Sequence, residues 1–535
     1  MVKKILHSFT SQHFKNKDKW HVVFFLLLIL AVSWWFHYFE IFHYAPYATH
    51  SWRQSDSVSF VQNYYNNGLD FFDLRVHHTI SGEGYGAPSE FPILYYLTAG
   101  IWKVFTPHDG VLRMIDFILL LLGLFSISRL TFHLTNDIFY ALFPPFLLMG
   151  SPVIAFFGFN YIPNPPALGL CLTGMLCFYY FYKNQKRKWL IISWLLFTLA
   201  GLLKVTVLIP FLALLGVFLL EKLNLIQFRS DRKIFKKGWW NLLYWISSFV
   251  IIGSWIVWVR NYNELHQCGI FMTKARPIWT LVEPAITETW HWVIREGAPQ
   301  YFHPFTRYTI FGMLFVLLFL WRKKQPEIIY FLNLLIFLGA LGCFLIFYRQ
   351  FFVHDYYAIE LMTFPAAVSV TFLYVFKNHF PKISNHLLSK MLLAVFLFIN
   401  LHYAKESIEE RYAGGVIFNR EYNVTTYKKQ QVQAYLKSLG IEHPEKVITM
   451  PDVSPNFNLN YFNLRGWSEF AMNPQPFEPW VFRAFMDNGA NYLIVTEEEY
   501  LTHQNLESFI KHPLGNFENS IFVFDLRRLP REPKD

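Results

Sequence analysis

The chain has 535 residues, of which 54% are hydrophobic and only 16% are charged, with a formal net charge of +10. Because soluble proteins carry about 25% charged residues, this composition excludes an ordinary soluble protein and indicates apolar helices in lipid. The positive charge would also suit a nucleic-acid-binding protein, but Lys and Arg cluster in short runs between apolar segments, as in the cytoplasmic loops of membrane proteins.

The N-terminal apolar run from Trp20 to Phe36 follows several lysines and precedes no small-residue cleavage site. We therefore expect an uncleaved membrane anchor rather than a signal peptide. Further apolar segments bring the expected number of spans to about eleven, at ~20 residues each. The expected spans are residues 20–38, 111–130, 137–157, 165–182, 189–203, 205–221, 239–259, 307–321, 327–348, 357–376 and 389–404.

The apolar segment Pro92–Phe105 is short and is interrupted by Lys103. If it crossed the membrane, the basic runs at residues 183–188 and 222–237 would lie outside, against the positive-inside rule. We therefore predict that this segment is an amphipathic helix on the outer surface.

The N-terminus is then cytoplasmic, and the protein is expected in the plasma membrane (the inner membrane of a bacterium). Three regions face outward: the loop at residues 43–110, the loop at residues 260–306 and the tail. Residues 1–404 form the predicted transmembrane module and residues 405–535 a small extracytoplasmic α/β domain. In this domain we expect a helix at residues 426–439 and buried strands at residues 446–450, 492–495 and 521–524.

The first outer loop contains His50-Ser-Trp-Arg-Gln-Ser-Asp56 and, later, Pro88-Ser-Glu-Phe-Pro92. Asp56 follows the first span closely, so it suits a general base held where a lipid head group meets an outside acceptor. A solvated charge, or a structural pair with Arg53 or Arg75, is the alternative. Glu90 has the same two interpretations, because a carboxylate near a helix start is also stabilised by the helix dipole.

A second group of polar residues is Arg349-Gln-Phe-Phe-Val-His-Asp-Tyr-Tyr357, just before an inward-running span. A helix N-terminus with Arg349, His354 and the Tyr357 hydroxyl suits a phosphate. An aromatic belt at the membrane surface is the alternative. Lys204 interrupts an apolar region near the outer end of a span, either as a functional cation or as a snorkelling anchor. Secondary candidates are Arg53, Asp355 and Tyr356.

Other residues predict structure rather than chemistry. Asn164 with Pro165 is typical of a helix start, with Asn164 as the cap. The four cysteines form no CxxC pair and the histidines show no metal-binding spacing, so no metal site is expected. No cofactor is firmly implied, although a divalent cation is left open. Asp452-Val-Ser-Pro-Asn456 follows the first strand of the tail domain, where it would touch the acceptor or serve only as a folded cap.

These motifs together resemble the lipid-linked-sugar-dependent glycosyltransferases of the C-type membrane fold, in particular the bacterial dolichyl-phosphate-mannose protein mannosyltransferase-like proteins and the aminoarabinose transferases. The resemblance covers about residues 20–380 and rests on four motifs in order. They are His-Ser-Trp-Arg-Gln-Ser-Asp at residues 50–56, Ser-Glu-Phe-Pro at 89–92, Leu-Leu-Lys-Val-Thr at 202–206 and His-Asp-Tyr-Tyr at 354–357.

The resemblance implies a polyprenyl-phosphate sugar donor, an acceptor (glycan, lipid or protein) outside the cytoplasm, and Asp56 as the catalytic base. Glu90 matches a second acidic position. Aminoarabinose transferases usually have Lys after that Glu, whereas this chain has Phe91. A phosphate contact from the position of that Lys is therefore lost, or is supplied instead by Lys204 or Arg349. Aminoarabinose is not carried over as the sugar.

The hypothetical mechanism needs a base for the acceptor hydroxyl and positive charge for the departing phosphate. Asp56 is the proposed base, Glu90 orients a substrate, and the phosphate contacts come from Lys204, Arg349, His354 and Tyr357. Direct attack inverts the anomeric centre, and a retaining route with a second close carboxylate stays open.

Three alternatives to this function remain. One is an oligosaccharide polymerase or ligase that uses diphosphate-linked donors. The second is a secondary transporter, which the absence of a visible repeat argues against. The third is an interaction protein in which the C-terminal domain is the working part.

Overall fold

The computed structural model describes residues 2–79, 82–226, 234–235, 238–272, 274–321, 328–414, 423–472 and 478–531, with side chains from residue 16 onward. The basic run at residues 322–324 and most of the one at residues 222–237 lie outside these ranges. The chain forms two compact units. The first comprises Met1–Ile41, Asp116–Ser254 and Lys274–Glu409, and the second comprises Phe42–Ile115, Trp255–Thr273 and Glu410–Asp535.

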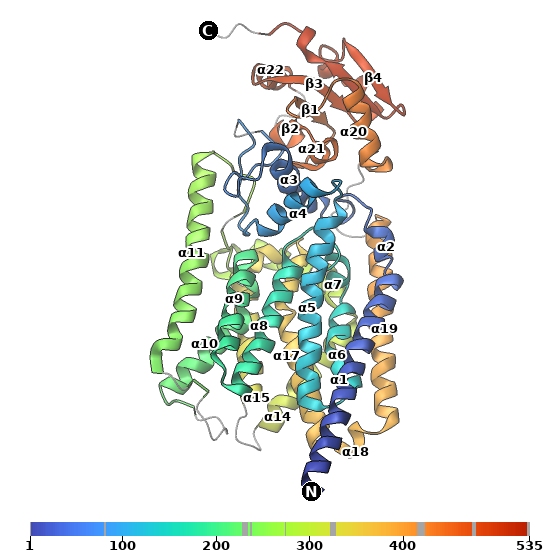
Figure 1. Cartoon of the computed structure of the whole chain (residues 1–535). Helices are drawn as coiled ribbons and strands as arrows, with labels where there is room; N and C mark the ends of the chain where they lie inside the picture. Colours follow the sequence, from blue (N-terminus) through green and yellow to red (C-terminus); the bar gives the residue numbers. More distant parts are fainter. Residues whose placement is uncertain are drawn as a thin grey trace. The chain divides into compact units, whose positions relative to one another are not determined.

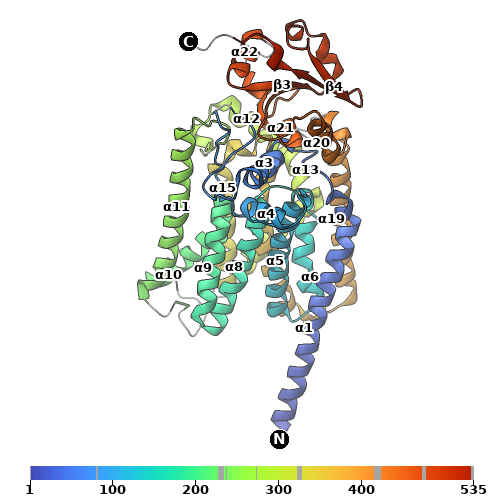
Figure 2. The same ribbon diagram turned by 45° about the horizontal axis from the view of Figure 1, so that its top comes forward.

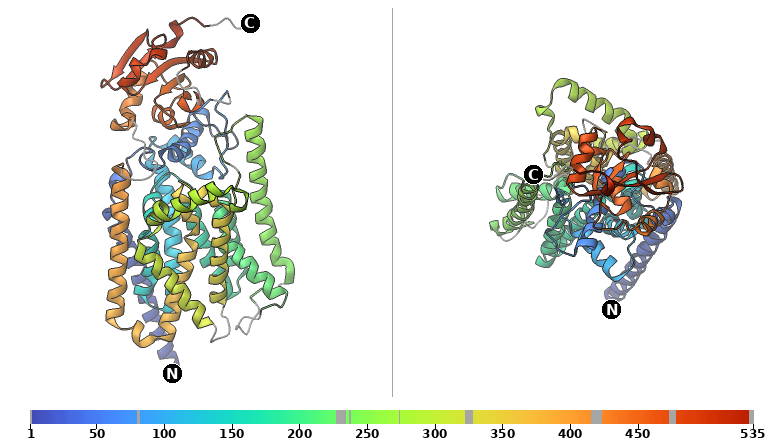
Figure 3. Two further views of the ribbon diagram at one scale, coloured as in Figure 1. Left: turned by 180° about the vertical axis from the view of Figure 1, so that it is seen from behind. Right: turned by 90° about the horizontal axis from the view of Figure 1, so that it is seen from above.

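The first unit is a bundle whose long helices run beside one another (Figure 1), as the further views also show (Figures 2 and 3). Helix α6 packs against α1 and α17, and α15 packs against α10 and α17. The helices are α1 (Val2–Trp35), α2 (Tyr38–Ile41), α6 (Ile138–Met149), α7 (Pro152–Phe157), α8 (Asn164–Asn184), α9 (Arg187–Leu203), α10 (Ile209–Lys222), α12 (Glu283–Trp292), α13 (Ala298–Tyr301), α14 (Pro304–Trp321), α15 (Ile328–Ile346), α16 (Ala358–Leu361), α17 (Thr363–His379) and α18 (Pro381–Ser384). Three helices have residues in both units: α5 (Gly110–Thr135), α11 (Leu242–Leu265) and α19 (Leu387–Tyr412).

Local sequence explains several helix ends and one close packing contact. Helix α8 begins at Asn164 with prolines in its first turn, where a missing N–H costs nothing. Helix α6 is capped by Asp137, which accepts from Phe139 N at 3.0 Å. Helices α5 and α8 approach closely at Gly169, where an added Cβ would lie 2.0 Å from Leu119 O. Small residues at such contacts are typical of helices packed in a membrane.

A helix lies at each of the eleven expected spans. By length and composition, six of the described helices can cross a membrane, or eight if two bent pairs each count as one span. The expected number of eleven is therefore not confirmed. Several of the expected spans contain shorter helices: α6 has 12 residues and is separated from α7 by Gly150 and Ser151, α10 has 14, and α9 and α17 have 17 each.

The second unit contains helices α3 (Ser51–Asn67) and α4 (Ile93–Val104), which lie side by side (Figures 1 and 2). The predicted surface helix is α4. Its 12 residues span ~18 Å, too short for a bilayer core of ~30 Å. Tyr95 and Trp102 are buried on one face, and the Tyr95 ring stacks on Phe60 of α3 at 5.6 Å. Leu97 and Val104 are exposed on the other face, so the helix is apolar on both sides.

A five-stranded sheet with order β2-β1-β3-β5-β4 forms the core of the C-terminal segment. Strands β2 (Arg465–Ser468), β1 (Lys446–Met450) and β3 (Ala490–Val495) are parallel. Strands β5 (Ile521–Asp525) and β4 (Pro513–Phe517) are antiparallel to their neighbours. The predicted α/β fold is confirmed, and the three expected strands correspond to β1, β3 and β5.

Helices pack on both faces of this sheet. Val447 of β1 lies in a core with α20 (Lys429–Ser438) and α21 (Phe457–Phe462). Its neighbour Ile448 points into the other core, with α22 (Pro479–Asp487). Alternation along the strand thus gives the sheet two buried faces, as expected for parallel strands covered by helices.

The first loop pairs with the edge of this sheet at β2. Thr79 N donates to Gly466 O at 2.9 Å, and Gly466 N donates to His77 O at 3.1 Å. At Gly466 φ is +145°, and an added Cβ would lie 1.7 Å from Val447 O. Only glycine fits this position.

Candidate active site

Asp56 lies in the first half of α3 and is 7% exposed. Its Oδ1 accepts a hydrogen bond of 2.7 Å from Nδ2 of Asn456, a residue 400 positions later in the chain. Asn456 directly precedes α21 and is fully buried. The base predicted from the first loop therefore has a partner in the C-terminal segment.

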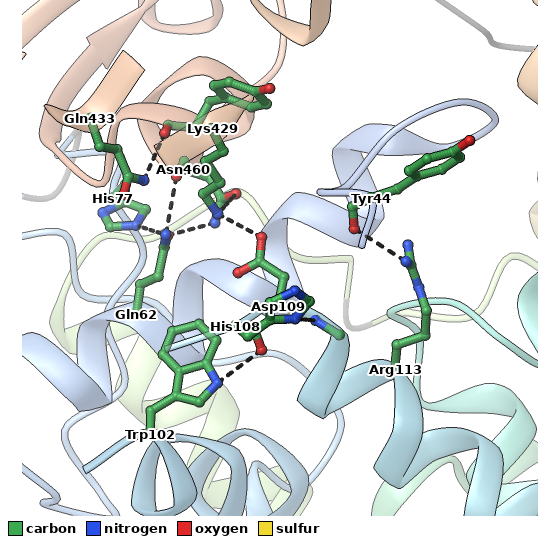
Figure 4. A network of polar contacts seen from close by, with 12 residues as sticks. Tyr44, Gln62, His77, Trp102, His108, Asp109, Arg113, Lys429, Gln433 and Asn460 are labelled. Atoms are coloured by element: carbon green, nitrogen blue, oxygen red, sulfur yellow. Dashed lines mark hydrogen bonds and ion pairs between the residues drawn. The ribbon is translucent and has the colours of Figure 1, made fainter. Parts of the chain in front are cut away.

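The orientation of the Asn456 amide follows from its two contacts. Its Oδ1 accepts from the backbone N–H of His78 at 3.0 Å. Because a backbone N–H only donates, the oxygen must face His78 and the NH₂ group must face the carboxylate. A second contact joins the same elements: Nδ2 of Asn460 donates to Oε1 of Gln62 at 2.7 Å (Figure 4).

Arg53 and Glu90 form an ion pair beside Asp56. Arg53 also donates to Ser57 Oγ at 3.1 Å, and Tyr95 of α4 donates its hydroxyl to Glu90 Oε1 at 3.0 Å. Glu90 is 5% exposed. It is held by Arg53 and Tyr95 rather than at the first turn of α4, whose cap position is Pro92.

Burial raises the pKa of Asp56 to about 6. The positive charge of Arg53 and the hydrogen bond from Asn456 oppose this increase, and the negative charge of Glu90 adds to it. A carboxylate with this pKa is ionised at neutral pH and is a stronger base than an exposed aspartate. Arg75, the other arginine considered for Asp56, instead pairs with Asp73 at 2.9 Å.

Phe91 occupies the position where the aminoarabinose transferases usually have Lys. Its ring packs against Phe71 and, edge on, against Trp255, each at 5.0 Å. The position therefore contributes apolar packing.

In the first unit, Lys204 follows α9 and lies close to Tyr357. Its Nζ is 4.5 Å from the centre of the Tyr357 ring and 3.8 Å from Oε1 of Glu360. Glu360 is 1% exposed and also accepts from Thr206 and from Asn164 Nδ2, at 3.1 and 2.8 Å. Asn164, expected as a helix cap, is the first residue of α8 and directs its amide to Glu360.

Arg349 and His354 lie on the segment before α16. Arg349 pairs with Glu288 at 2.8 Å and donates to Thr289 Oγ1 at 2.8 Å. His354 Nδ1 donates to Phe352 O at 3.0 Å, because a carbonyl oxygen only accepts. Tyr356 stacks on Tyr357 at 5.2 Å. Asp355 is almost fully buried.

The structure thus brings together Arg53, Asp56 and Glu90 in one unit, and Lys204 and Tyr357 in the other. The contacts of Asn456 were not predicted from the sequence, and Glu360 was not named there as a candidate residue at all. A carboxylate inside an apolar span was the available signal for Glu360. Among the described residues, no group of three His, Cys, Asp or Glu side chains is placed to hold a metal ion.

Comparison with protein-family profiles gives no match, and no curated protein sequence matches the chain. Solved structures do match over nearly the whole chain. ArnT from Cupriavidus metallidurans, at 12% identity and a TM-score of 0.54, covers 95% of this chain and 98% of its own. The apo oligosaccharyltransferase of Archaeoglobus fulgidus, at 11% identity and 0.52, covers 93% and 74%.

The arabinofuranosyltransferase AftD from Mycobacteria also matches, at 11% identity and a TM-score of 0.51. The match covers 95% of this chain but 40% of AftD. The three proteins share the C-type membrane glycosyltransferase fold. This chain is therefore a multi-pass membrane protein of that fold with a small C-terminal α/β segment.

Proposed function

We propose that the protein transfers a sugar from a polyprenyl-phosphate donor to an acceptor outside the cytoplasm. One observation carries the proposal: Asp56 is a buried carboxylate with a pKa of about 6, held by a side-chain amide and flanked by the Arg53–Glu90 pair. The fold is that of proteins named as oligosaccharyl- and arabinofuranosyltransferases, which supports the reaction class.

In the proposed reaction the acceptor hydroxyl oxygen attacks the anomeric carbon. The bond between that carbon and the phosphate oxygen breaks, the hydroxyl proton goes to Asp56, and polyprenyl phosphate leaves with the electron pair. Because the phosphate is a good leaving group, one base and nearby positive charge suffice. A single direct displacement inverts the anomeric centre.

Lys204 is the proposed contact for the departing phosphate, with Tyr357 as its neighbour. Their 4.5 Å contact supports this assignment, since the ring holds the ammonium group in place. Arg349 and His354 are secondary phosphate candidates. Arg349 already has a carboxylate partner, Glu288, which a phosphate would have to replace.

Asn456 is the proposed positioning residue for the base. Its amide contacts both Asp56 and the backbone of His78, so it fixes the carboxylate relative to the first loop. Glu90 and Arg53 set the charge around the base, and Glu90 orients the acceptor or the sugar.

The experiment compares Asp56→Asn with wild type, using purified full-length protein and radiolabelled sugars on undecaprenyl phosphate or diphosphate. Membrane extract supplies the acceptor. We expect transfer from the monophosphate donors and a loss of about 10²–10⁴-fold in Asp56→Asn. Asp73→Asn is the control, because Asp73 is a carboxylate of the same loop with its own partner, Arg75. Wild-type transfer by Asp56→Asn, or transfer only from diphosphate donors, would overturn the proposal.

A further inference from the structure

The second unit contains a cavity of about 690 Å³ whose walls come from residues 43–47 after α2, residues 108–109 before α5, Tyr412 at the end of α19, residues 425–430 and Tyr461 of α21. Its volume is of the same order as the ~300–1,000 Å³ of pockets that hold small ligands. Five of its lining residues are tyrosines: Tyr44, Tyr47, Tyr412, Tyr427 and Tyr461.

Aromatic rings of the cavity are packed against one another. The Tyr412 ring stacks on Tyr47 at 6.1 Å and meets Tyr44 edge on at 5.6 Å. The hydroxyl of Tyr427 donates to Ser520 Oγ at 2.8 Å. Tyrosines held in this way present rigid, flat faces with polar tips, at little cost in side-chain entropy on binding.

A buried ion pair lies at the same cavity. Nζ of Lys429 is 2.8 Å from Oδ2 of Asp109 and also donates to Asn460 Oδ1 at 3.3 Å (Figure 4). Lys429 is 7% exposed. A largely buried ion pair is stabilised by further hydrogen bonds, of which Asn460 supplies one and the hydroxyl groups of a ligand in the cavity would supply more.

The charge of this wall favours a neutral ligand. Asp109 and Lys429 cancel each other, and Lys428, the third charged side chain of the lining, is exposed to solvent. Burial lowers the pKa of His108, another lining residue, so that its ring is uncharged at neutral pH. A phosphate would compete with Asp109 for the ammonium group. Hydroxyl groups, in contrast, donate to a carboxylate and accept from an ammonium group at the same time.

The cavity is joined to the proposed base through two helices. Lys429 contacts Asn460 of α21, and Asn460 contacts Gln62 of α3 (Figure 4). Gln62 lies six residues after Asp56 on the same helix, which is ~9 Å along the helix axis. The hydrogen bonds from Lys429 to Asn460 and from Asn460 to Gln62 therefore link the cavity wall to the helix that carries Asp56.

We propose that this cavity binds a neutral oligosaccharide. In the proposed function, this oligosaccharide is the part of the acceptor that follows the sugar with the reacting hydroxyl. The tyrosine faces cover the apolar sides of the sugar rings, and Asp109 and Lys429 bind ring hydroxyls. The role as acceptor rests on the proposed function, whereas the binding itself does not.

The test measures binding of maltotriose, mannotriose and N,N′,N″-triacetylchitotriose to the full-length protein in nanodiscs, by saturation-transfer NMR and calorimetry. We expect at least one to bind wild type. Tyr412→Ala and the double variant Asp109→Asn/Lys429→Gln should each weaken it about tenfold, since one aromatic contact or one lost pair of hydrogen bonds is worth about 1.4 kcal/mol. Thermal melting checks that both variants fold.

The matched control is Lys437→Gln/Glu442→Gln, which removes an exposed ion pair of 3.0 Å at the other end of α20. Binding is measured without a sugar donor and needs no transfer, so this assay is separate from the failure or success of the transfer proposal. Three results would overturn the inference: no trisaccharide binds, both cavity variants bind normally, or inorganic phosphate displaces the sugar.

Discussion

Asn456 donates a 2.7 Å hydrogen bond to Asp56 while its own oxygen accepts from the backbone of His78. The chain thus uses a residue of its C-terminal segment to hold a carboxylate of its first loop. Neither group can turn without losing a buried hydrogen bond, which costs about 1–3 kcal/mol. This relationship makes the C-terminal segment part of the proposed site, and it leads to the first prediction.

Asn456→Leu should move the acid limb of the pH–rate profile to higher pH. The asparagine hydrogen bond lowers the pKa of Asp56, so its loss raises that pKa, and more of the base is protonated at a given pH below neutrality. We expect a shift of about one pH unit, measured as log kcat/KM against pH. Asn488→Leu, on the exposed end of α22, is the control. A uniform loss of activity with an unshifted limb would mean that Asn456 has only a structural role.

In wild type the rate should fall about tenfold per pH unit below pH 6, because Asp56 acts as a base only when ionised and its pKa is about 6. Arg53→Met should raise the pH at which this fall begins, and Glu90→Gln should lower it, since the two charges act on the carboxylate in opposite directions. The double variant should lie between the two. Shifts in the same direction from both single variants would contradict this electrostatic account.

Lys204→Met should reduce kcat, because the phosphate loses its main proposed cationic contact, and should also lower the melting temperature, because Glu360 is left buried without its partner. The double variant Lys204→Met/Glu360→Gln should recover stability but not transfer. Lys183→Met, at the end of α8, serves as the control. Recovery of transfer together with stability would show that Lys204 acts only as the partner of Glu360.

Gly466→Ala should destabilise the C-terminal segment and separate the first loop from the sheet. Its Cβ would lie 1.7 Å from Val447 O, and its φ of +145° is unfavourable for alanine. Limited proteolysis should reveal cleavage in the first loop at temperatures where wild type resists. Gly269→Ala, in the second unit with open space around it, should behave as wild type. If both variants resist proteolysis equally, the close approach at Gly466 is not needed.

The helices were predictable because their signal is local. An apolar run such as residues 328–346 indicates a helix whatever surrounds it. Strands β1, β3 and β5 are likewise short buried runs between turn residues. In contrast, β2 consists of Arg465, Gly466, Trp467 and Ser468, which carry no strand pattern. Its pairing depends on β1 and on the first loop, and these are distant in the chain.

The residues of the candidate site also fall into two groups: those that the sequence indicates and those that only the structure shows. Asp56, Glu90 and Lys204 stand out in the sequence, because charged groups beside or within apolar segments are costly and need a reason. Asn456 does not stand out, since one asparagine in a loop resembles any other. Its role follows from a contact across 400 positions.

The sequence by itself determined that this is a membrane protein with many apolar helices and an α/β segment, since both follow from the burial of local apolar patterns. Only the tertiary structure decided which polar groups meet: Asn456 with Asp56, Arg53 with Glu90, and Lys204 with Glu360. The physical reason is that a buried polar group must find a partner, but its own residue type does not specify where in the chain that partner lies.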